Sequence, residues 1–534
     1  MTSHYQTAYI RSLAEPEAFW LEAADAIDWI QRPTKAGEPQ ADGMWAWFPD
    51  GTLNTCHNAV DRHVAAGHGE RLALVWDSAM TGEIRRFSFA DLQDQVSRVA
   101  GMLAAHGIEK GDRVIVYMPM VPEAVFAMLA CARLGAVHSV VFGGFAAHEL
   151  AKRIDDAEPR LILAASCGLE PGRIVEYKPL LDTACDLARH QLEHCILLQR
   201  PQCTAAMQPD RDIDWNEALV SADLAPCVPV AATDPLYILY TSGTTGIPKG
   251  VVHDNGGHAV AMAWSMPNVY GAQPGETFWA GSDIGWAVGH SYIVYGPLIH
   301  GCTTIMFEGK PVGTPDADAF WRVIRDHNVD VFFTAPTAIR AIKREDPEGR
   351  FVAERGTGQL RALFLAGERA DPDTLAWAER MLGLPVIDHW WQTELGWPAI
   401  ATCLGLDERD VLHGSAGRSV PGYSFATLDE DNREVETGST GDLAIKLPMP
   451  PGCLPTLWRK HEHFQNAYLA AHPGYYTTGD AGVIDADGRI HIMSRIDDII
   501  NVAGHRLSTG GIEQILAAHP DVAECAVIGA ADSL

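Results

Sequence analysis

The sequence lacks the features that mark membrane, secreted and zinc-binding proteins. No uninterrupted apolar stretch reaches the roughly 18 residues that a membrane-spanning helix needs. The 11 cysteines are scattered and odd in number, and no Cys-x-x-Cys pair occurs, so neither a zinc site nor a disulfide framework is indicated. The first residues carry no basic segment followed by an apolar core, and Glu15 and Glu17 come early. We therefore expect a cytoplasmic protein without a membrane partner.

Positive charge is also scarce. Lysine and arginine number 40 against 69 aspartates and glutamates, which gives a net charge of −29, and no Lys/Arg-rich run offsets it. Such a surface repels nucleic acid, so none is expected as a partner. Solubility alone explains the acidity. An anionic small-molecule substrate would need a locally positive site, and the oligomeric state is left open.

The pattern of apolar residues predicts an α/β fold. A chain of 534 residues is too long for one compact core. Gly111–Pro119 and Ala136–Phe142 are strand-like and flank the helical pattern of Glu123–Leu134, which indicates a parallel sheet covered by helices. Phe87–Leu103 has apolar residues three and four apart after a serine and an aspartate, as in a capped amphipathic helix. Further strands are expected at Pro159–Ala165, Cys195–Gln199, Thr303–Phe307, Val329–Phe333, Arg361–Leu365 and Pro385–Ile387.

The two ends of the chain differ from this middle region. The first 60 or so residues are rich in tryptophan and proline and are expected to form a helical and irregular cap. From about Gly417, short strands and tight turns predict a small β-rich subdomain, with hairpin-type signals at Asp429–Asn432 and Asp485–Gly488. The expected fold is a large N-terminal domain of helix-covered parallel sheets, a small β-rich subdomain and an incomplete small α+β C-terminal domain.

A Walker A motif is missing, but another glycine-rich string follows a strand-like run. Tyr240–Gly250 contains three glycines, three threonines, a serine and a lysine. Backbone N–H groups freed by glycine, with hydroxyls and a lysine, can surround phosphate oxygens. Because Pro248 precedes Lys249 and Gly250 follows it, the Lys-Ser/Thr pair of a P-loop kinase is absent. The alternative is a flexible surface turn.

Asp388–Glu394 follows another strand and ends in a hydroxyl next to a carboxylate, Thr393 and Glu394. Such oxygen donors can hold Mg²⁺ beside phosphates. The alternative is a helix N-terminus with Thr393 as its cap.

Gly474–Asp480 ends in an aspartate after a glycine, and its carboxylate can accept both hydroxyls of a ribose, or it can form an Asx-turn. Arg495 and Arg506 offer planar donors to ribose or phosphate, although surface ion pairing explains most arginines. Asp283–His290 suits a tight apolar pocket or a close-packed junction. No convincing Ser–His–Asp arrangement is present.

In this order, the motifs resemble those of the acyl-CoA synthetases of the adenylate-forming superfamily, in the acetyl-CoA synthetase branch. The likeness covers essentially the whole chain, and it is closest to propionyl-CoA synthetases. Supporting strings are Leu53–His63, Phe307–Asp316, Phe332–Thr337, Lys343–Pro347 and Phe364–Glu368. The resemblance implies an ATP-dependent acid–thiol ligase that forms acyl-AMP and pyrophosphate and then acyl-CoA and AMP. It implies ATP, Mg²⁺ and coenzyme A as substrates, propionate as the carboxylate, and no prosthetic group.

The resemblance also assigns residues to the nucleotide and to catalysis. Those implied for the nucleotide are Thr241, Ser242, Gly243, Thr244, Thr245 and Gly246 in the phosphate loop, Gly367, Glu368, Asp388 and Gln392 near adenine, Thr393 with Glu394 at phosphate and Mg²⁺, Asp480 with Arg495 at the ribose, and His389 and Trp390 elsewhere along the nucleotide. Those implied for catalysis are Lys249, Thr244, Glu394 and Arg506, with Asp497 as the hinge between the half-reactions. Those implied for coenzyme A are Gly143, Gly144, Arg173 and Gly504.

The size of the acyl pocket follows from side-chain volume. In acetate-specific relatives a tryptophan is paired with two valines and a threonine. In this chain Trp391 stands at the position of that tryptophan. Ala287 and Ala366 stand at the positions of the two valines, and Val288 stands at the position of the threonine. Two smaller residues leave room for at least one more carbon, which favours propionate over acetate and leaves butyrate open.

The chain departs from the family's pattern near its end. The family's small C-terminal domain normally runs on well past the hinge and carries a catalytic lysine, whereas the last lysine here is Lys460. The expected parts are residues 1–62 as an N-terminal segment, 63–496 as the AMP-binding domain with a β-rich subdomain at about 417–496, and 497–534 as the start of a truncated C-terminal domain. Two alternatives stay open: an acetyl-CoA synthetase, and a truncated, weakly active ATP- or acyl-binding protein.

Overall fold

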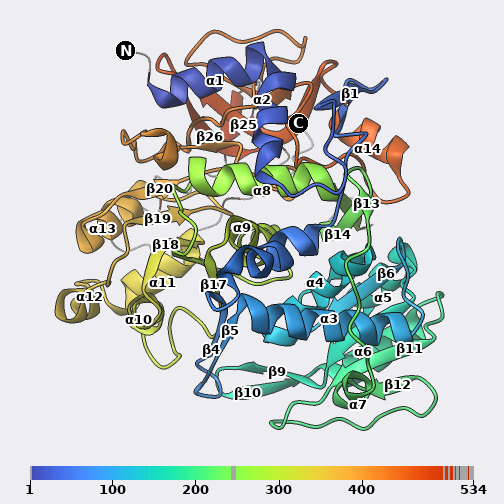
Figure 1. Ribbon diagram of the computed structural model, residues 1–534. Helices are drawn as coiled ribbons and strands as arrows, with labels where there is room; N and C mark the ends of the chain where they lie inside the picture. Colours follow the sequence, from blue (N-terminus) through green and yellow to red (C-terminus); the bar gives the residue numbers. More distant parts are fainter. Residues whose placement is uncertain are drawn as a thin grey trace.

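The computed structural model describes residues 3–143, 145–241 and 248–496, the backbone of 499–502 and 505–508, and the single positions Ile512, Leu516 and Val527. Two seven-stranded sheets and one six-stranded sheet organise this part of the chain (Figure 1). Most neighbouring strands in the two large sheets run parallel, and the third sheet is antiparallel. The predicted helix-covered parallel sheets and the β-rich region are therefore confirmed.

The first sheet ends in an antiparallel hairpin that carries the phosphate-loop motif. Its strands, in spatial order, are β12 (Asp212–Asp214), β11 (His194–Leu198), β8 (Leu161–Ala165), β6 (Arg113–Tyr117), β7 (Val137–Val140), β14 (Pro235–Thr241) and β15 (Lys249–Asp254). Strand β15 is antiparallel to β14.

The second sheet carries the segments expected to bind adenine and the acyl group. Its strands, in spatial order, are β20 (Val386–Asp388), β19 (Ala362–Leu365), β18 (Val329–Thr334), β16 (Thr277–Gly281), β17 (Thr303–Glu308), β4 (Leu72–Ser78) and β5 (Glu83–Ser88).

Helices lie on both faces of each large sheet because neighbouring strand residues point in opposite directions. Ile115 of β6 packs with the outer helices, whereas Val114 and Val116 pack into the central core. The central helices, which share one apolar core with both sheets, are α3 (Phe89–Ala105), α4 (Pro122–Leu134), α8 (Asn255–Asn268) and α9 (Gly296–His300). The outer helices are α5 (Ala147–Ala157) and α6 (Tyr177–Leu187) on the first sheet, and α10 (Ala319–Asp326), α11 (Pro336–Glu345) and α13 (Pro372–Leu382) on the second.

Local sequence signals account for several element ends. Ser88 and Asp91 form a capping box at the start of α3, since each side chain accepts from the other residue's backbone N–H. The predicted turn at Asp485–Gly488 joins β25 (Tyr475–Ile484) to β26 (Arg489–Arg495). The other strands of the third sheet are β21 (Ile400–Ala401), β22 (Gly417–Ser419), β23 (Phe425–Leu428) and β24 (Thr440–Lys446).

The N-terminal cap contains strand structure that the sequence pattern did not predict. Besides α1 (His4–Ala14) and α2 (Pro16–Ala23), it forms β1 (Gly37–Pro39), β2 (Trp45–Trp47) and β3 (Thr52–Leu53). Strand β3 pairs with β13 (Val230–Ala231), far along the chain. These strands are two or three residues long, too short for an alternating pattern to show.

A cluster of tryptophans fixes the cap to the rest of the molecule. Trp20 of α2 is 1% exposed, and its ring makes edge contacts with Trp47, Trp264 and Trp397 at centroid distances of 5.9–6.2 Å. Trp264 belongs to α8, and Trp397 follows the second sheet. The cap, the central helix and the segment after β20 therefore share one aromatic contact region.

Replacing Trp20 with alanine is expected to destabilise this region. Large-to-small changes at buried aromatic positions cost about 3–5 kcal/mol, because the transfer free energy is lost and a cavity remains. We expect Trp20→Ala to lower the midpoint temperature of the first thermal unfolding transition clearly. Ile30→Ala, at a side chain that is 59% exposed, is the control and should change it little. Equal shifts in the two variants would contradict the role of the cluster.

Candidate active site

The phosphate-loop motif closes the β14–β15 hairpin at the edge of the first sheet. Thr241, the last residue of β14, is paired with Lys249, the first residue of β15. The predicted loop residues Ser242, Gly243, Thr244, Thr245 and Gly246 lie outside the described residues. The hairpin nevertheless shows where that loop begins and ends.

Lys249 and Glu394 meet at one tyrosine. The Nζ atom of Lys249 lies 4.9 Å from the ring centroid of Tyr468, the last residue of α14 (His461–Tyr468). The hydroxyl of the same tyrosine donates to Oε1 of Glu394 at 2.7 Å. A cation expected for phosphate and a carboxylate expected for Mg²⁺ thus contact one tyrosine, the first at its ring and the second at its hydroxyl.

Thr393 and Glu394 lie in a turn, and no helix begins there. The N–H groups of Leu395 and Gly396 both donate to the carbonyl of Gln392, and the chain then continues without helix. The alternative of a helix capped by Thr393 is therefore wrong. The backbone carbonyl oxygen of Thr393 lies 2.8 Å from Nε2 of His253. The imidazole of His253 is buried, and this burial lowers its pKa to about 4.

Gln392 connects this turn to the third sheet. Its Nε2 donates to the carbonyl of Thr478 at 2.7 Å and to Oδ2 of Asp480 at 3.0 Å, while its Oε1 accepts from the hydroxyl of Tyr476 at 3.2 Å. Asp480 lies within β25 rather than in an Asx-turn. The amide is held at both ends, so its orientation is fixed.

Arg495 faces Asp480 across the β25–β26 pair. The two residues are register partners, and the closest nitrogen–oxygen distance is 3.8 Å. Gly479 precedes the aspartate at φ +76°, and a Cβ there would lie 2.8 Å from the guanidinium. Glycine is therefore required for the arginine to lie against this turn.

The other residues predicted for the nucleotide, near adenine and at His389 and Trp390, differ from one another in their burial and contacts. Glu368 accepts from Arg340 at 2.8 Å, and Gly367 has a φ of +106°. Burial raises the pKa of Asp388 well above its usual range. His389 is buried, with Nδ1 at 2.7 Å from the carbonyl of Leu365, and burial lowers its pKa to about 4. Trp390 packs edge-on against Phe425 of β23.

The four predicted acyl-pocket residues come from segments that follow three parallel strands of the second sheet. Ala287 and Val288 follow β16, Ala366 follows β19, and Trp391 follows β20. All four belong to or pack against the same apolar cluster. Parallel strands bring their carboxyl ends to one edge, which is where ligands of such sheets bind.

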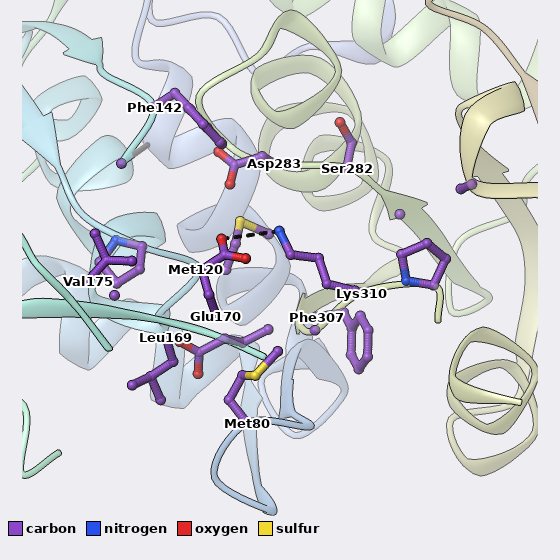
Figure 2. Close-up of a pocket in the computed structure, with 18 of the residues that line it drawn as sticks. Met80, Met120, Phe142, Leu169, Glu170, Val175, Ser282, Asp283, Phe307 and Lys310 are labelled. Carbon is purple, nitrogen blue, oxygen red and sulfur yellow. Dashed lines mark ion pairs between the residues drawn. The ribbon is translucent and has the colours of Figure 1, made fainter. Parts of the chain in front are cut away.

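A cavity of about 310 Å³ brings together two of the residues predicted for coenzyme A, Gly143 and Arg173 (Figure 2). Arg173 is exposed on β10 (Arg173–Glu176), which pairs with β9 (Cys167–Glu170). A Cβ at position 143 would lie 2.0 Å from the hydroxyl of Tyr177, so close packing alone requires glycine there. Gly144 and Gly504 lie outside the described residues, as does Asp497, and of Arg506 only the backbone is described.

A second cavity adjoins the phosphate end of the site, by which we mean the ends of the predicted phosphate loop at Thr241 and Pro248. Thr241, Pro248, Trp286 and Thr393 are among its lining residues. It therefore joins the ends of the β14–β15 hairpin to the turn that carries Glu394.

Comparison with known proteins identifies the family. Residues 61–450 match the family described as AMP-binding enzyme, and residues 5–59 match the acetyl-coenzyme A synthetase N-terminus.

The chain belongs to the AMP-binding enzyme family.

The relatives of this AMP-binding enzyme align with it over almost its whole length. It is 56% identical over 530 residues to an uncharacterised protein of Pseudomonas aeruginosa, covering 99% of this chain and 84% of that one. It is 49% identical over 534 residues to the mitochondrial acyl-CoA synthetase short-chain family member 3 of Homo sapiens, covering 100% and 78%. It is 46% identical over 531 residues to the propionate–CoA ligase of Salmonella typhimurium, covering 98% and 84%.

Acetoacetyl-CoA synthetase from Streptomyces lividans has a similar fold, with a TM-score of 0.88 at 23% identity over 97% of this chain and 78% of that one. The resemblance stated from the motifs is therefore confirmed as to family and fold. The domain boundaries and the roles of individual site residues stay predictions.

Sequence reasoning missed several residues that hold the site of this AMP-binding enzyme together. Tyr476 and Thr478 lie inside the quoted Gly474–Asp480 motif, whose polar residues were the signal that pointed to them. Tyr468 and His253 lie far from any motif and gave no local signal. Their contacts with Glu394 and Thr393 arise only from the fold.

The described residues also contain one group of possible metal ligands that sequence spacing did not reveal. Cys56, Asp61 and Cys227 place their ligand atoms within 4.8 Å of one another. The carboxylate of Asp61 already forms an ion pair with Arg133 at 2.7 Å, so the guanidinium of Arg133 takes the place that a metal ion would have at this carboxylate.

No helix in the described part of the chain has the length and apolar character needed to traverse a bilayer.

Removing the Tyr468 hydroxyl is expected to weaken nucleotide binding. A hydrogen bond to a charged group contributes about 1.5–3 kcal/mol, so losing it should raise the Kd for Mg·ATP about tenfold or more. Tyr468→Phe keeps the ring against Lys249 and removes only the bond to Glu394. Tyr475→Phe, a nearby tyrosine outside the network, is the control in the same calorimetric titration. Identical affinities in the two variants would contradict the role of Tyr468.

Proposed function

We propose that this AMP-binding enzyme is an ATP-dependent acid–thiol ligase whose preferred carboxylate is propionate. One observation carries the proposal. The run from Trp391 to Glu394 joins the apolar pocket to the polar network without interruption, so an acyl chain beside Trp391 places its carboxylate next to Thr393 and Glu394. The relatives named propionate–CoA ligase support this choice, as do the motifs.

The reaction has two steps. A carboxylate oxygen attacks the α-phosphorus of ATP, the bond to pyrophosphate breaks, and acyl-AMP forms. The thiol of coenzyme A then attacks the acyl carbon, and AMP leaves. Both steps join anions, so the enzyme must neutralise charge and hold the reactants in line. Lys249 supplies positive charge at the phosphate end, and Asp480 with Arg495 fits the ribose.

Magnesium fits the donors present. Thr393 offers a hydroxyl and Glu394 a carboxylate, and Mg²⁺ takes oxygen ligands and keeps several waters beside phosphates. The hydroxyl of Tyr468 holds one carboxylate oxygen of Glu394. When bound, the ion neutralises phosphate charge, while the protein groups fix its position.

Side-chain volume favours propionate over acetate. Ala287 is 8% exposed and Ala366 is 5% exposed, so both small side chains are buried in the apolar cluster. Val288 adds an apolar surface, and Trp391 closes the pocket against Tyr292 at a centroid distance of 5.6 Å. Alanines at these two positions occupy less volume than valines would, which favours propionate over acetate, and the large Trp391 side chain limits the length of the acyl chain.

Turnover with a series of carboxylates tests the proposed function. Release of AMP and pyrophosphate is measured with acetate, propionate and butyrate in the presence of Mg·ATP and coenzyme A. We expect the highest kcat/KM with propionate. Absence of carboxylate-dependent AMP formation would contradict the ligase, and a higher value with acetate would favour the acetyl-CoA synthetase alternative.

Refilling the pocket should reverse the preference. In Ala287→Val/Ala366→Val, two added methyl pairs fill the space of the extra carbon, and one methylene in such a pocket contributes about 1–3 kcal/mol. The ratio of kcat/KM for propionate over acetate should therefore fall about tenfold or more. Ala353→Val, on an exposed position of α12 (Arg350–Arg355), is the matched control. An unchanged ratio in the double variant would rule out this account of specificity.

A cytoplasmic location, the absence of nucleic-acid and membrane partners, the hinge at Asp497 and the roles of Arg506 and Gly504 belong to this proposal as well. They rest on composition and motif resemblance alone.

A further inference from the structure

The short segment Asp283–Trp286 contributes one lining residue to each of the two cavities. Asp283 lines the cavity that contains Gly143. Three residues later, Trp286 lines the cavity at the phosphate end, together with Thr393. Asp283, four residues before Ala287, therefore lines the cavity from which a thiol would approach an acyl group bound beside Ala287 and Val288.

The carboxylate of Asp283 is held in place and faces the first cavity. Its Oδ1 accepts from the N–H of Gly285 at 2.7 Å, and its backbone carbonyl accepts from the N–H of Trp286 at 3.2 Å. Figure 2 shows the side chain directed into the same space as Glu170 and Lys310. The turn accounts for Oδ1, and no hydrogen bond or ion pair of Oδ2 is found within the described ranges.

The charges around Asp283 adjust its basicity. The pKa of Asp283 is raised to about 6: burial raises it most, the Gly285 N–H and Lys310 lower it, and Glu170 raises it. The carboxylate is therefore ionised near neutral pH and is a stronger base than an ordinary aspartate. The phenol of Tyr177 also faces the Asp283 carboxylate. Burial raises the pKa of this phenol, so it stays neutral.

The other acidic groups of this cavity are already engaged. Glu308 receives two bonds from a buried arginine at 2.8 and 3.1 Å and a third from a serine. Glu170 is paired with Lys310 at 3.3 Å. Among the carboxylates that line the described cavity, Asp283 is thus the one placed to accept a proton.

We propose that Asp283 accepts the proton of the coenzyme A thiol as the thioester forms. The proposal rests on the proposed function. The S–H bond breaks and its proton goes to Asp283, a bond forms between sulfur and the acyl carbon, and the bond from that carbon to the AMP phosphate oxygen breaks. AMP leaves as the anion, and Asp283 later releases its proton to solvent. A thiol with a pKa of about 8.5 is mostly protonated at neutral pH, so a nearby base accelerates its attack.

Separate assays of the two half-reactions test this role. Propionate-dependent exchange between ATP and pyrophosphate reports the first step. Formation of propionyl-CoA from chemically prepared propionyl-adenylate reports the second. In Asp283→Asn, the amide oxygen can still accept from Gly285, but the base is lost. We expect the second step to slow about 100-fold or more near neutral pH, the range typical of general base catalysis, and the exchange to stay unchanged.

The pH profile separates a proton acceptor from a structural residue. In the unaltered enzyme, the rate of the second step should rise through about pH 6 and then level off, as Asp283 ionises. In Asp283→Asn, the rate of the second step should keep rising with pH, because the thiol itself ionises. The ratio of the rates of the unaltered enzyme and the variant should therefore become smaller at alkaline pH. Asp373→Asn, a side chain 90% exposed and remote in sequence, is the matched control and should behave like the unaltered enzyme.

Three outcomes would overturn the inference. They are an unchanged second step in Asp283→Asn, an equal loss in both half-reactions, and a loss that does not narrow in alkali. Failure of the unaltered enzyme in both assays would instead contradict the proposed function.

Discussion

The arrangement of the site depends on the side-chain amide of Gln392. This one group bonds to the carbonyl of Thr478, the carboxylate of Asp480 and the hydroxyl of Tyr476. Gln392 follows the edge strand of the second sheet, whereas its three partners lie on β25 of the third. Both of its polar atoms are satisfied, and a buried polar group left unsatisfied would cost about 1–3 kcal/mol. Because Glu394 is two residues away, the same contact also sets the distance between the ribose end and the phosphate end.

Much of the fold could be predicted because its signals are local. Strands such as Ala362–Leu365 are short apolar runs bounded by turns, and the capping box at Ser88 uses adjacent residues. The β25–β26 hairpin follows from turn chemistry at Asp485–Gly488. The short strands of the N-terminal cap could not be predicted, since β3 is stabilised by β13, more than a hundred residues away.

The candidate site divides in the same way. The motifs around Lys249, Glu394 and Asp480 were visible as strings in the sequence, and the structure brings these three residues to one network. The tyrosine that links Lys249 to Glu394 was not visible, because Tyr468 ends a helix that has no motif. The choice between a helix cap and a turn at Thr393 also needed the structure. Contacts made across the chain leave no trace in local spacing, whereas loops that bind phosphate must keep their glycines.

The two cavities suggest how one enzyme can carry out two chemically different steps. Asp283 lines the cavity with Gly143 and Arg173, and Trp286, three residues later, lines the cavity beside Thr241 and Thr393. Charge neutralisation is needed where anions meet, and a base is needed where a thiol attacks. In a chain of net charge −29, the proposed function assigns the first task to the positive charges of Lys249 and Arg495, and our further inference assigns the second to the acidic Asp283.

The most direct test of the central claim follows an oxygen atom. Propionate labelled with oxygen-18 in its carboxylate is incubated with the enzyme, Mg·ATP and coenzyme A, and the nucleotide product is examined by mass spectrometry. If the carboxylate attacks the α-phosphorus, AMP carries one labelled oxygen and pyrophosphate carries none. Label in inorganic phosphate or pyrophosphate, with unlabelled AMP, would contradict the account.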